Sequence, residues 1–274
     1  MVQYPYLLVA EKSLLALIPL VINSLERNAK PSKIYIIVPH QEVSEFKSCV
    51  QGHISIISEN DVLPDWSIKR VRQQLKQKQR AGWYLQQFLK LSFGEFANLS
   101  EYVIWDADTV ALTAPKLTDG STTYFCKSRE YHRPYFGVYT QLLNNQPSLE
   151  CSVISQYMLI KTSVVRCLQT QIQANSRSKC WISGILETIP GEDASEFSEY
   201  ETYANFFNMQ NPTQCKLTNT KWFRYGAAII DDPHSMTLEA VTNKFRGYQH
   251  VAFERHPASL RRKLIAKLLL FLGK

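Results

Sequence analysis

The sequence lacks the marks of several common protein classes. Its six cysteines form no CxxC pair and no Cys/His grouping at metal-binding spacing. It has no apolar run long enough to span a bilayer, no internal repeat and no low-complexity linker. Its N-terminus has no basic start, and Glu11 and Lys12 interrupt the first apolar run, unlike a signal peptide. These absences argue against a disulfide scaffold, an integral membrane protein and a solenoid, and we expect a protein of the reducing cytoplasm.

The composition is that of a globular protein whose positive charge is unevenly placed. Of 274 residues 45% are hydrophobic, which is enough for a sizeable core, and the net charge is +7. Residues 244–274 hold eight Lys/Arg against one acid, Glu254, and a second basic run spans 69–80. Both runs indicate a phosphate-bearing partner. No aromatic residues interleave with them as in a stacking platform, so we do not expect nucleic-acid binding.

Hydrophobic periodicity predicts alternating strands and helices. Apolar runs predict strands at 6–10, 34–38, 54–57, 102–105, 123–126, 153–160 and 227–230. Helical spacing predicts helices at 14–28, 68–97 with a break near 81–82, 163–173, 179–188 and 197–209. The order favours an α/β fold of three α/β/α layers around a mostly parallel sheet. We expect a single domain over 1–257, followed by a basic amphipathic helix over 258–274.

Two carboxylates follow one of the predicted strands directly. Asp106 and Asp108 come after the apolar run at 102–105. In an open α/β sheet, ligands bind beyond the carboxyl ends of the strands. Carboxylate oxygens there suit Mg²⁺ or Mn²⁺, which would bridge phosphate oxygens and neutralise a leaving diphosphate. The alternative is a polar turn in which one aspartate caps a helix.

Three segments in this order carry a resemblance to a known family. They are 82–90 (GWYLQQFLK), 103–108 (VIWDAD) and 197–203 (FSEYETY). Together with the DxD pattern, they resemble GT-A glycosyltransferases, and more narrowly a bacterial family of glycosyltransferase-like proteins associated with surface polysaccharide synthesis. The similarity covers roughly residues 4–255. It implies the GT-A fold and transfer of a sugar from a nucleotide-sugar donor, with Mn²⁺ or Mg²⁺, to a glycan or lipid-linked acceptor.

The helical segment after residue 80 offers polar candidates for the donor. Arg80, Gln86, Gln87 or Lys90 could contact its phosphates or sugar, and a cation there would stabilise the departing diphosphate. The alternative is an amphipathic helix with solvated polar residues. The resemblance favours a donor-binding role for Gln87 and Lys90, with Arg80 beside them.

Two glutamates are candidates for proton transfer or acceptor binding. Glu199 and Glu201 are two residues apart, so on a helix they diverge by about 200° and cannot face one ligand. Either could act as general base if the configuration inverts. The alternative is an acidic helix start favoured by the helix dipole.

In GT-A enzymes a histidine or carboxylate late in the chain often completes the metal shell. His234, His250 and His256 are the candidates here. We prefer His250 because the apolar run 251–253 follows it. The alternative is a histidine satisfied by other core or surface groups.

The last sixteen residues read as an interfacial helix. In 259–274 the apolar residues share one helical face and five Lys/Arg occupy much of the other. The segment is too short to span a bilayer, so we expect it to lie on an anionic membrane at the cytoplasmic face. The alternative is a helix docked on the domain.

Two other functions compete with sugar transfer. The strand followed by Asp-x-Asp also resembles the Asp-x-Asp-x-Thr motif of haloacid-dehalogenase-type phosphatases. In that family's terms Asp106 would be the nucleophile, Asp108 the general acid and Asp231–Asp232 the late acidic motif. Against this, about a hundred residues precede the motif, and Thr109 stands where that family has glycine. The other rival is a non-catalytic, membrane-peripheral module that binds a nucleotide sugar.

Overall fold

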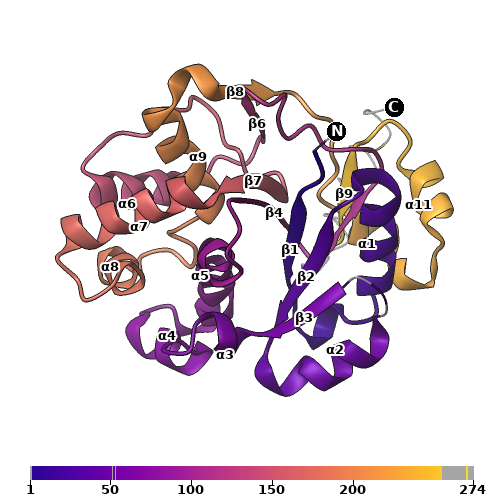
Figure 1. The fold of residues 1–274 in the computed structure, drawn as a ribbon, viewed down its shortest axis with the longest axis horizontal. Coiled ribbons are helices and arrows are strands. Elements are labelled where there is room, and N and C mark those ends of the chain that lie inside the picture. The colour runs from indigo at the N-terminus through magenta and orange to yellow at the C-terminus, as the bar shows by residue number, and fades with distance from the viewer. Residues whose placement is uncertain (1, 51, 53, 255–269, 271–274) are drawn as a thin grey trace. The chain divides into compact units, whose positions relative to one another are not determined.

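The chain forms two compact units, each built from several stretches of sequence. The computed structural model describes residues 2–50, 52, 54–254 and 270. The first unit comprises 1–56, 105–116 and 219–274, and the second comprises 57–104 and 117–218. Figure 1 shows the course of the chain through both. The single domain over 1–257 stays a prediction. Apart from residue 270, the helix expected over 258–274 lies outside the described residues, as does His256.

The first unit is built on parallel strands. Its strands are β1 (Pro5–Val9), β2 (Lys33–Val38), most of β3 (Ile54–Ser58), β5 (Thr109–Ala111) and β9 (His250–Ala252). Its α-helices are α1 (Ile18–Ser24), α2 (Val43–Cys49), α10 (Gly226–Ile229) and α11 (Leu238–Lys244). The strands β3, β2 and β1 are neighbours in that order, and β1 runs parallel to β2 with Leu7 opposite Tyr35. The apolar runs of β1 and β2 are therefore those of strands covered on both faces.

The helix after β1 ends in a wider turn. A π-helical turn, Leu25–Ala29, follows α1, and Lys30 ends it in the left-handed region at φ 52°. This ending presents Ser24 and Asn28 to a neighbouring strand. The Ser24 hydroxyl accepts a hydrogen bond from the Ala111 N–H at 2.9 Å, and the Asn28 amide donates to the Ala111 carbonyl at 2.9 Å. Polar groups of α1 and its extension therefore hold β5 in place.

The second unit is mainly helical. Its helices are α3 (Glu59–Val62), α4 (Ile68–Gln74), α5 (Ala81–Phe96), α6 (Arg133–Leu143), α7 (Thr162–Ser176), α8 (Trp181–Thr188) and α9 (Glu199–Gln210). Its strands are β4 (Glu101–Trp105, whose last residue belongs to the first unit), β6 (Thr123–Cys126), β7 (Tyr157–Lys161) and β8 (Cys215–Thr218). β4 neighbours β7, and β6 pairs in parallel with β8. Buried aromatic rings of α5, β4, β6 and α9 fill its core, among them Phe93 against Tyr102 and Phe125 against Phe207.

The chain is an α/β protein with a mostly parallel sheet, as the sequence predicts. The strands expected at 6–10, 34–38, 54–57, 102–105 and 123–126 all form. The strand expected at 227–230 is wrong, because Gly226–Ile229 form the short helix α10. The strand expected at 153–160 begins only at Tyr157, and the helix break lies at 75–77 rather than at 81–82. None of the helices in the described part of the chain is long and apolar enough to cross a membrane.

Gly94 in α5 gives a direct test of this packing. A Cβ atom there would lie 2.2 Å from Thr162 Oγ1 and 2.7 Å from Tyr102 Cε1. We expect Gly94→Ala to lower the free energy of unfolding by about 1–3 kcal/mol through overpacking. The control is Gly137→Ala in α6, where a Cβ meets nothing within 4 Å and should stabilise by about 0.5–1 kcal/mol. Urea denaturation of both variants measures this, and equal effects would contradict the tight packing at Gly94.

Candidate functional site

The two predicted metal-binding aspartates lie on a tight turn in the first unit. β4 ends at Trp105, the turn occupies 106–108, and β5 begins at Thr109. Trp105, Ala107 and Thr109 are buried, whereas Asp106 and Asp108 between them are partly exposed. The alternation places both carboxylates toward the surface, and neither aspartate caps a helix because a strand follows.

Three hydrogen bonds fix the backbone of this turn, and a fourth joins two of its side chains. The Thr109 N–H donates to the Asp106 carbonyl at 3.0 Å, and the Phe253 N–H donates to the Asp108 carbonyl at 2.8 Å. The Trp105 indole N–H donates to the Thr109 carbonyl at 2.7 Å, and the Thr109 hydroxyl donates to Asp108 Oδ1 at 3.2 Å. Three of these bonds use main-chain carbonyls, so they fix the turn without occupying the carboxylate oxygens.

The donor set of this turn fits a hard divalent cation. Mg²⁺ in nucleotide sites is typically held by one or two carboxylates, with phosphate oxygens and waters completing the shell. Asp106 and Asp108 supply such a pair on a fixed backbone. Within residues 2–50, 52, 54–254 and 270, no three His, Cys, Asp or Glu side chains gather as they would for an all-protein metal cage. The two carboxylates suit a metal whose other ligands are phosphate oxygens and waters.

His250 lies inside the first unit in an aromatic setting. It is 0% exposed, its ring stacks on Trp222 with centroids 5.3 Å apart, and the Trp105 ring meets it edge-on at 5.9 Å. Through β9, its backbone pairs with Ala111 of β5. His250 thus packs beside the strand that follows the aspartates. Its role as a third metal ligand stays a prediction, while His234 lies elsewhere in the unit, 2.7 Å from Asp232.

In the second unit, the predicted donor-binding residues share one stripe of α5. Gln87 and Lys90 of α5, and Arg80 at its N-cap, recur at helical spacing on the side that meets the segment from 195 to 200. Arg80 donates to the Ser195 hydroxyl at 2.9 Å and lies 4.4 Å from the Trp83 ring centroid. Gln86 has no such partner in this unit. In the structure these three side chains contact Ser195 and the start of α9, and their contact with a donor stays a prediction.

Glu199 and Lys90 form a buried ion pair. The Lys90 amine is 2.7 Å from Glu199 Oε1, and the two side chains are 3% and 5% exposed. Gln87 Oε1 accepts the Glu199 N–H at 2.8 Å, and the Lys90 amine also lies 4.8 Å from the Tyr200 ring centroid. These contacts attach the first turn of α9 to α5. The geometry supports a positioning role for this pair, and its contact with substrate stays a prediction.

Glu201 faces a different part of the same unit, as its spacing from Glu199 requires. Its Oε1 accepts hydrogen bonds from the Ser152 hydroxyl and, at 3.3 Å, from the Val153 N–H. In the described chain, Oε2 is buried with no hydrogen-bond partner. Burial raises the pKa of this carboxyl to about 7, against the opposing effect of these two donors. A carboxyl with that pKa can hold or release a proton near neutral pH.

Several residues near these sites carry no sequence motif. In the second unit, His132 Nε2 lies 2.7 Å from the Ser195 carbonyl, and Tyr135 stacks against Trp83 with centroids 6.3 Å apart. In the first unit, Arg224 pairs with Glu254 at 2.8 Å, next to the Phe253 N–H that holds Asp108. Each of these residues lies at least 30 positions along the chain from the residue it contacts. For Arg224 the sequence does offer one signal, the interleaving of basic and aromatic residues at 221–225.

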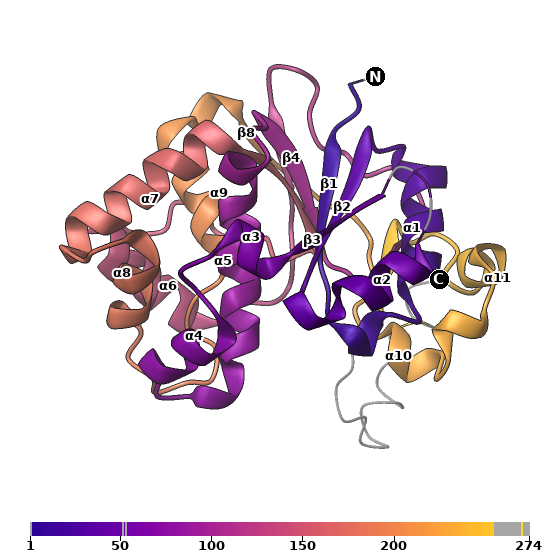
Figure 2. The same ribbon diagram turned by 60° about the horizontal axis from the view of Figure 1, so that its bottom comes forward.

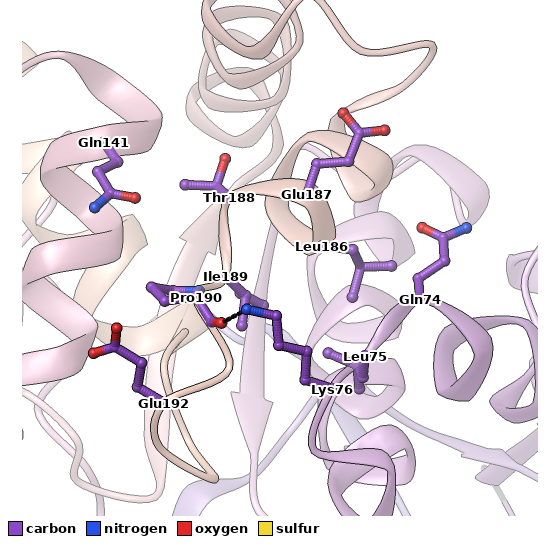
Figure 3. Close-up of a pocket in the computed structure, with 10 residues that line it drawn as sticks. All are labelled: Gln74, Leu75, Lys76, Gln141, Leu186, Glu187, Thr188, Ile189, Pro190 and Glu192. Atoms are coloured by element: carbon purple, nitrogen blue, oxygen red, sulfur yellow. Dashed lines mark hydrogen bonds between the residues drawn. The ribbon is translucent and has the colours of Figure 1, made fainter.

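A surface cavity of the second unit lies apart from these residues. It has a volume of about 590 Å³ and is lined by side chains of α4, α6, α8 and the segment after α8 (Figure 3). Lys76 extends across it to the Pro190 carbonyl. The lining contains none of the predicted site residues. We therefore do not assign the catalytic site to this cavity.

Family membership can be read from the sequence match. Residues 13–252 match the model of a family described as a family of unknown function (DUF6492). The chain belongs to the DUF6492 family. The match spans the carboxylate turn, the α5 stripe and His250. No curated protein matches the chain.

Solved glycosyltransferase structures are similar in fold. Mouse xyloside xylosyltransferase 1 in its apo form is 13% identical, with a TM-score of 0.45, covering 92% of this chain and 98% of its own. The galactosyltransferase LgtC, in complex with donor and acceptor sugar analogues, is 13% identical with a TM-score of 0.48, covering 98% and 95%. An active-site mutant of LgtC is 12% identical with a TM-score of 0.49, and the match covers 96% of this chain and 95% of its own.

The buried ion pair predicts a strongly non-additive mutant cycle. Lys90→Met leaves the Glu199 carboxylate buried without its ammonium partner, and we expect a loss of about 3–5 kcal/mol in the free energy of unfolding. Adding Glu199→Gln removes that charge and should recover part of the loss. Urea denaturation of the two single variants and the double variant measures the coupling. Additive losses would show that the pair is not coupled in solution.

The raised pKa of Glu201 predicts a pH-dependent stability. The folded state binds this proton up to about pH 7, whereas an ordinary carboxyl loses it near 4.5. The free energy of unfolding should therefore fall as pH rises through this window, because the folded state holds more protons than the unfolded state. In Glu201→Gln the free energy of unfolding should decrease by about 1–3 kcal/mol less over this pH range. The glutamine oxygen can still accept the hydrogen bond from Ser152. An unchanged slope in Glu201→Gln would contradict the assignment.

Proposed function

We propose that this chain is a metal-dependent glycosyltransferase of the GT-A type, which moves a sugar from a nucleotide-sugar donor to a glycan or lipid-linked acceptor. The observation that carries the proposal is the pair of partly exposed carboxylates, Asp106 and Asp108, on a fixed turn at the end of β4. The DxD pattern and the three sequence segments that resemble this class of enzyme support it.

Asp106 and Asp108 would hold Mn²⁺ or Mg²⁺ together with the donor's phosphate oxygens. When bound, the metal would supply charge neutralisation for the departing diphosphate. The chain's own contribution is to keep the two carboxylates aligned. The Thr109 hydroxyl orients Asp108 at 3.2 Å, and the Phe253 N–H fixes its main chain. Preorganised ligands of this kind lose little entropy when the metal and donor bind.

A role of the α5 stripe in binding the donor or the acceptor is a further proposal, which rests on the sequence resemblance. Arg80 is its most available cation, since it is partly exposed and only one of its nitrogen atoms bonds Ser195. Glu199, through Lys90 and Gln87, would position the start of α9 beside it. Proton transfer by Glu199 or Glu201 stays a proposal. Both carboxyls are buried, so an acceptor hydroxyl could reach either only after a local opening.

One structural observation weighs against the phosphatase alternative. That reading needs a late strand ending in an acidic pair, and 227–230 would be this strand. These residues instead form helix α10, so Asp231 and Asp232 do not follow a strand. A role in surface polysaccharide synthesis, and attachment to a membrane through 259–274, are further proposals that depend on the sequence alone.

The carboxylate turn gives the decisive test. Asp108→Asn keeps the size of the side chain but removes a charged ligand, so we expect Mn²⁺-dependent binding of a nucleotide sugar to weaken at least about tenfold, or about 1.4 kcal/mol. Calorimetry with a panel of nucleotide sugars, and release of free nucleoside diphosphate, measure the effect. Asp61→Asn, at an exposed aspartate of the second unit, is the matched control and should behave as wild type.

Two outcomes would reject the proposal. Full Mn²⁺-dependent binding and turnover by Asp108→Asn would show that this carboxylate holds no metal. Rapid hydrolysis of a simple phosphate ester, with a phosphoryl group trapped on Asp106, would establish the phosphatase instead.

A further inference from the structure

The second unit carries a strongly basic surface that the proposed catalysis does not use. We define the α4 basic surface as five exposed cations on α4 and the turn after it, namely Lys69, Arg70, Arg72, Lys76 and Lys78. No acidic residue occurs in the sequence from Trp66 to Gly94. The positive charge of this segment is therefore not offset along the chain, as it would be on an ordinary solvated helix.

The packing of α4 directs these cations outward. Ser67 caps the helix by accepting the Arg70 N–H at 3.3 Å. Val71 and Leu75, one turn apart, are 0% and 4% exposed and form the buried side, which packs against α5 and α8. Every other residue of α4 is exposed. Figures 1 and 2 both show α4 beside α5 at the edge of the second unit.

Two of the five cations already have partners within the unit. Arg70 donates to the Asp65 carbonyl and lies 4.5 Å from the Trp66 ring centroid, and Lys76 donates to the Pro190 carbonyl. In the part of the chain that the structure describes, the side chains of the other three, Lys69, Arg72 and Lys78, make no hydrogen bond or ion pair. Their charge is available to a partner outside the chain.

We propose that the α4 basic surface binds the anionic headgroups of a lipid membrane. Beside the cations, Ile68 is 41% exposed, which places an aliphatic side chain where it could enter the boundary between headgroups and acyl chains. The one aromatic residue of the segment, Trp66, is only 5% exposed and lies under Arg70. Because binding to single-stranded nucleic acid relies on exposed aromatic rings that stack on bases, this composition favours lipid over nucleic acid.

This inference is independent of the proposed sugar transfer and of the tail at 259–274. It rests on side chains of the second unit, and its test needs neither metal nor donor. Each Lys or Arg near an anionic leaflet contributes on the order of 1 kcal/mol at low salt, less where ions screen it. Three available cations therefore give a weak, reversible and salt-sensitive attachment, suited to assisting another membrane contact.

The test is co-sedimentation of the full-length protein with vesicles of phosphatidylglycerol and phosphatidylcholine, and with pure phosphatidylcholine. The variant is Lys69→Gln, Arg72→Gln, Lys78→Gln. The matched control is Arg177→Gln, Lys179→Gln, Lys216→Gln, which removes the same charge from exposed positions elsewhere in the second unit. We expect partitioning into anionic vesicles to weaken about tenfold in the variant and little in the control. Thermal unfolding should remain unchanged in both.

Three results would overturn the proposal. If the variant binds anionic vesicles as well as wild type does, the α4 basic surface makes no membrane contact. If variant and control weaken equally, net charge rather than this surface governs binding. If wild type binds a single-stranded oligonucleotide through these three cations and binds no vesicle, the surface belongs to a nucleic-acid partner.

Discussion

The candidate metal site depends on one constraint, the backbone of the turn from Trp105 to Thr109. Its main-chain carbonyls are held by the Trp105 indole and by the N–H groups of Thr109 and Phe253. The buried residues of the turn alternate with the two aspartates, so burying Trp105 and Ala107 forces both carboxylates outward. Two metal-binding carboxylates on this turn therefore lower the stability of the fold little, because apolar packing and not their charge determines the geometry of the turn.

Three buried carboxyl groups of the second unit have different kinds of partner. Glu196 accepts three backbone N–H groups, from Gly191, Glu192 and Asp193, at 2.6 to 3.1 Å. Glu199 faces the ammonium of Lys90. Glu201 has two donors on one oxygen, and burial raises its pKa instead. In Glu201 both donors share one oxygen, and the other oxygen is buried without a hydrogen-bond partner in the described chain, so burial has the larger effect on its pKa. Of these residues, Glu201 has the property most useful to proton transfer.

The sequence predicted what short-range patterns determine. Apolar runs identified β1, β2, β4 and β6, and the carboxylates after β4 follow from that pattern. It failed at 227–230, where Gly226 lies so close to the Ala252 carbonyl that a Cβ atom would be 2.7 Å from it, and tertiary packing outweighed β propensity. The pairing of Lys90 with Glu199, 109 residues apart, has no local signature. Nor could periodicity foresee His250 between two tryptophans, because three distant segments meet there.

The contrast between buried and exposed charges also applies to the α4 basic surface. Burying an ion is costly, so the partners of Glu196 and Glu199 are requirements of folding. An exposed lysine or arginine stabilises the fold little, and a run of like charges repels itself. The fold of the second unit needs the buried side chains of Val71 and Leu75. It does not need those of Lys69, Arg72 or Lys78, which make no side-chain hydrogen bond or ion pair in the described chain. Polar neutral side chains would serve folding equally well at those three positions. Their charge is therefore best explained by an anionic partner outside the chain.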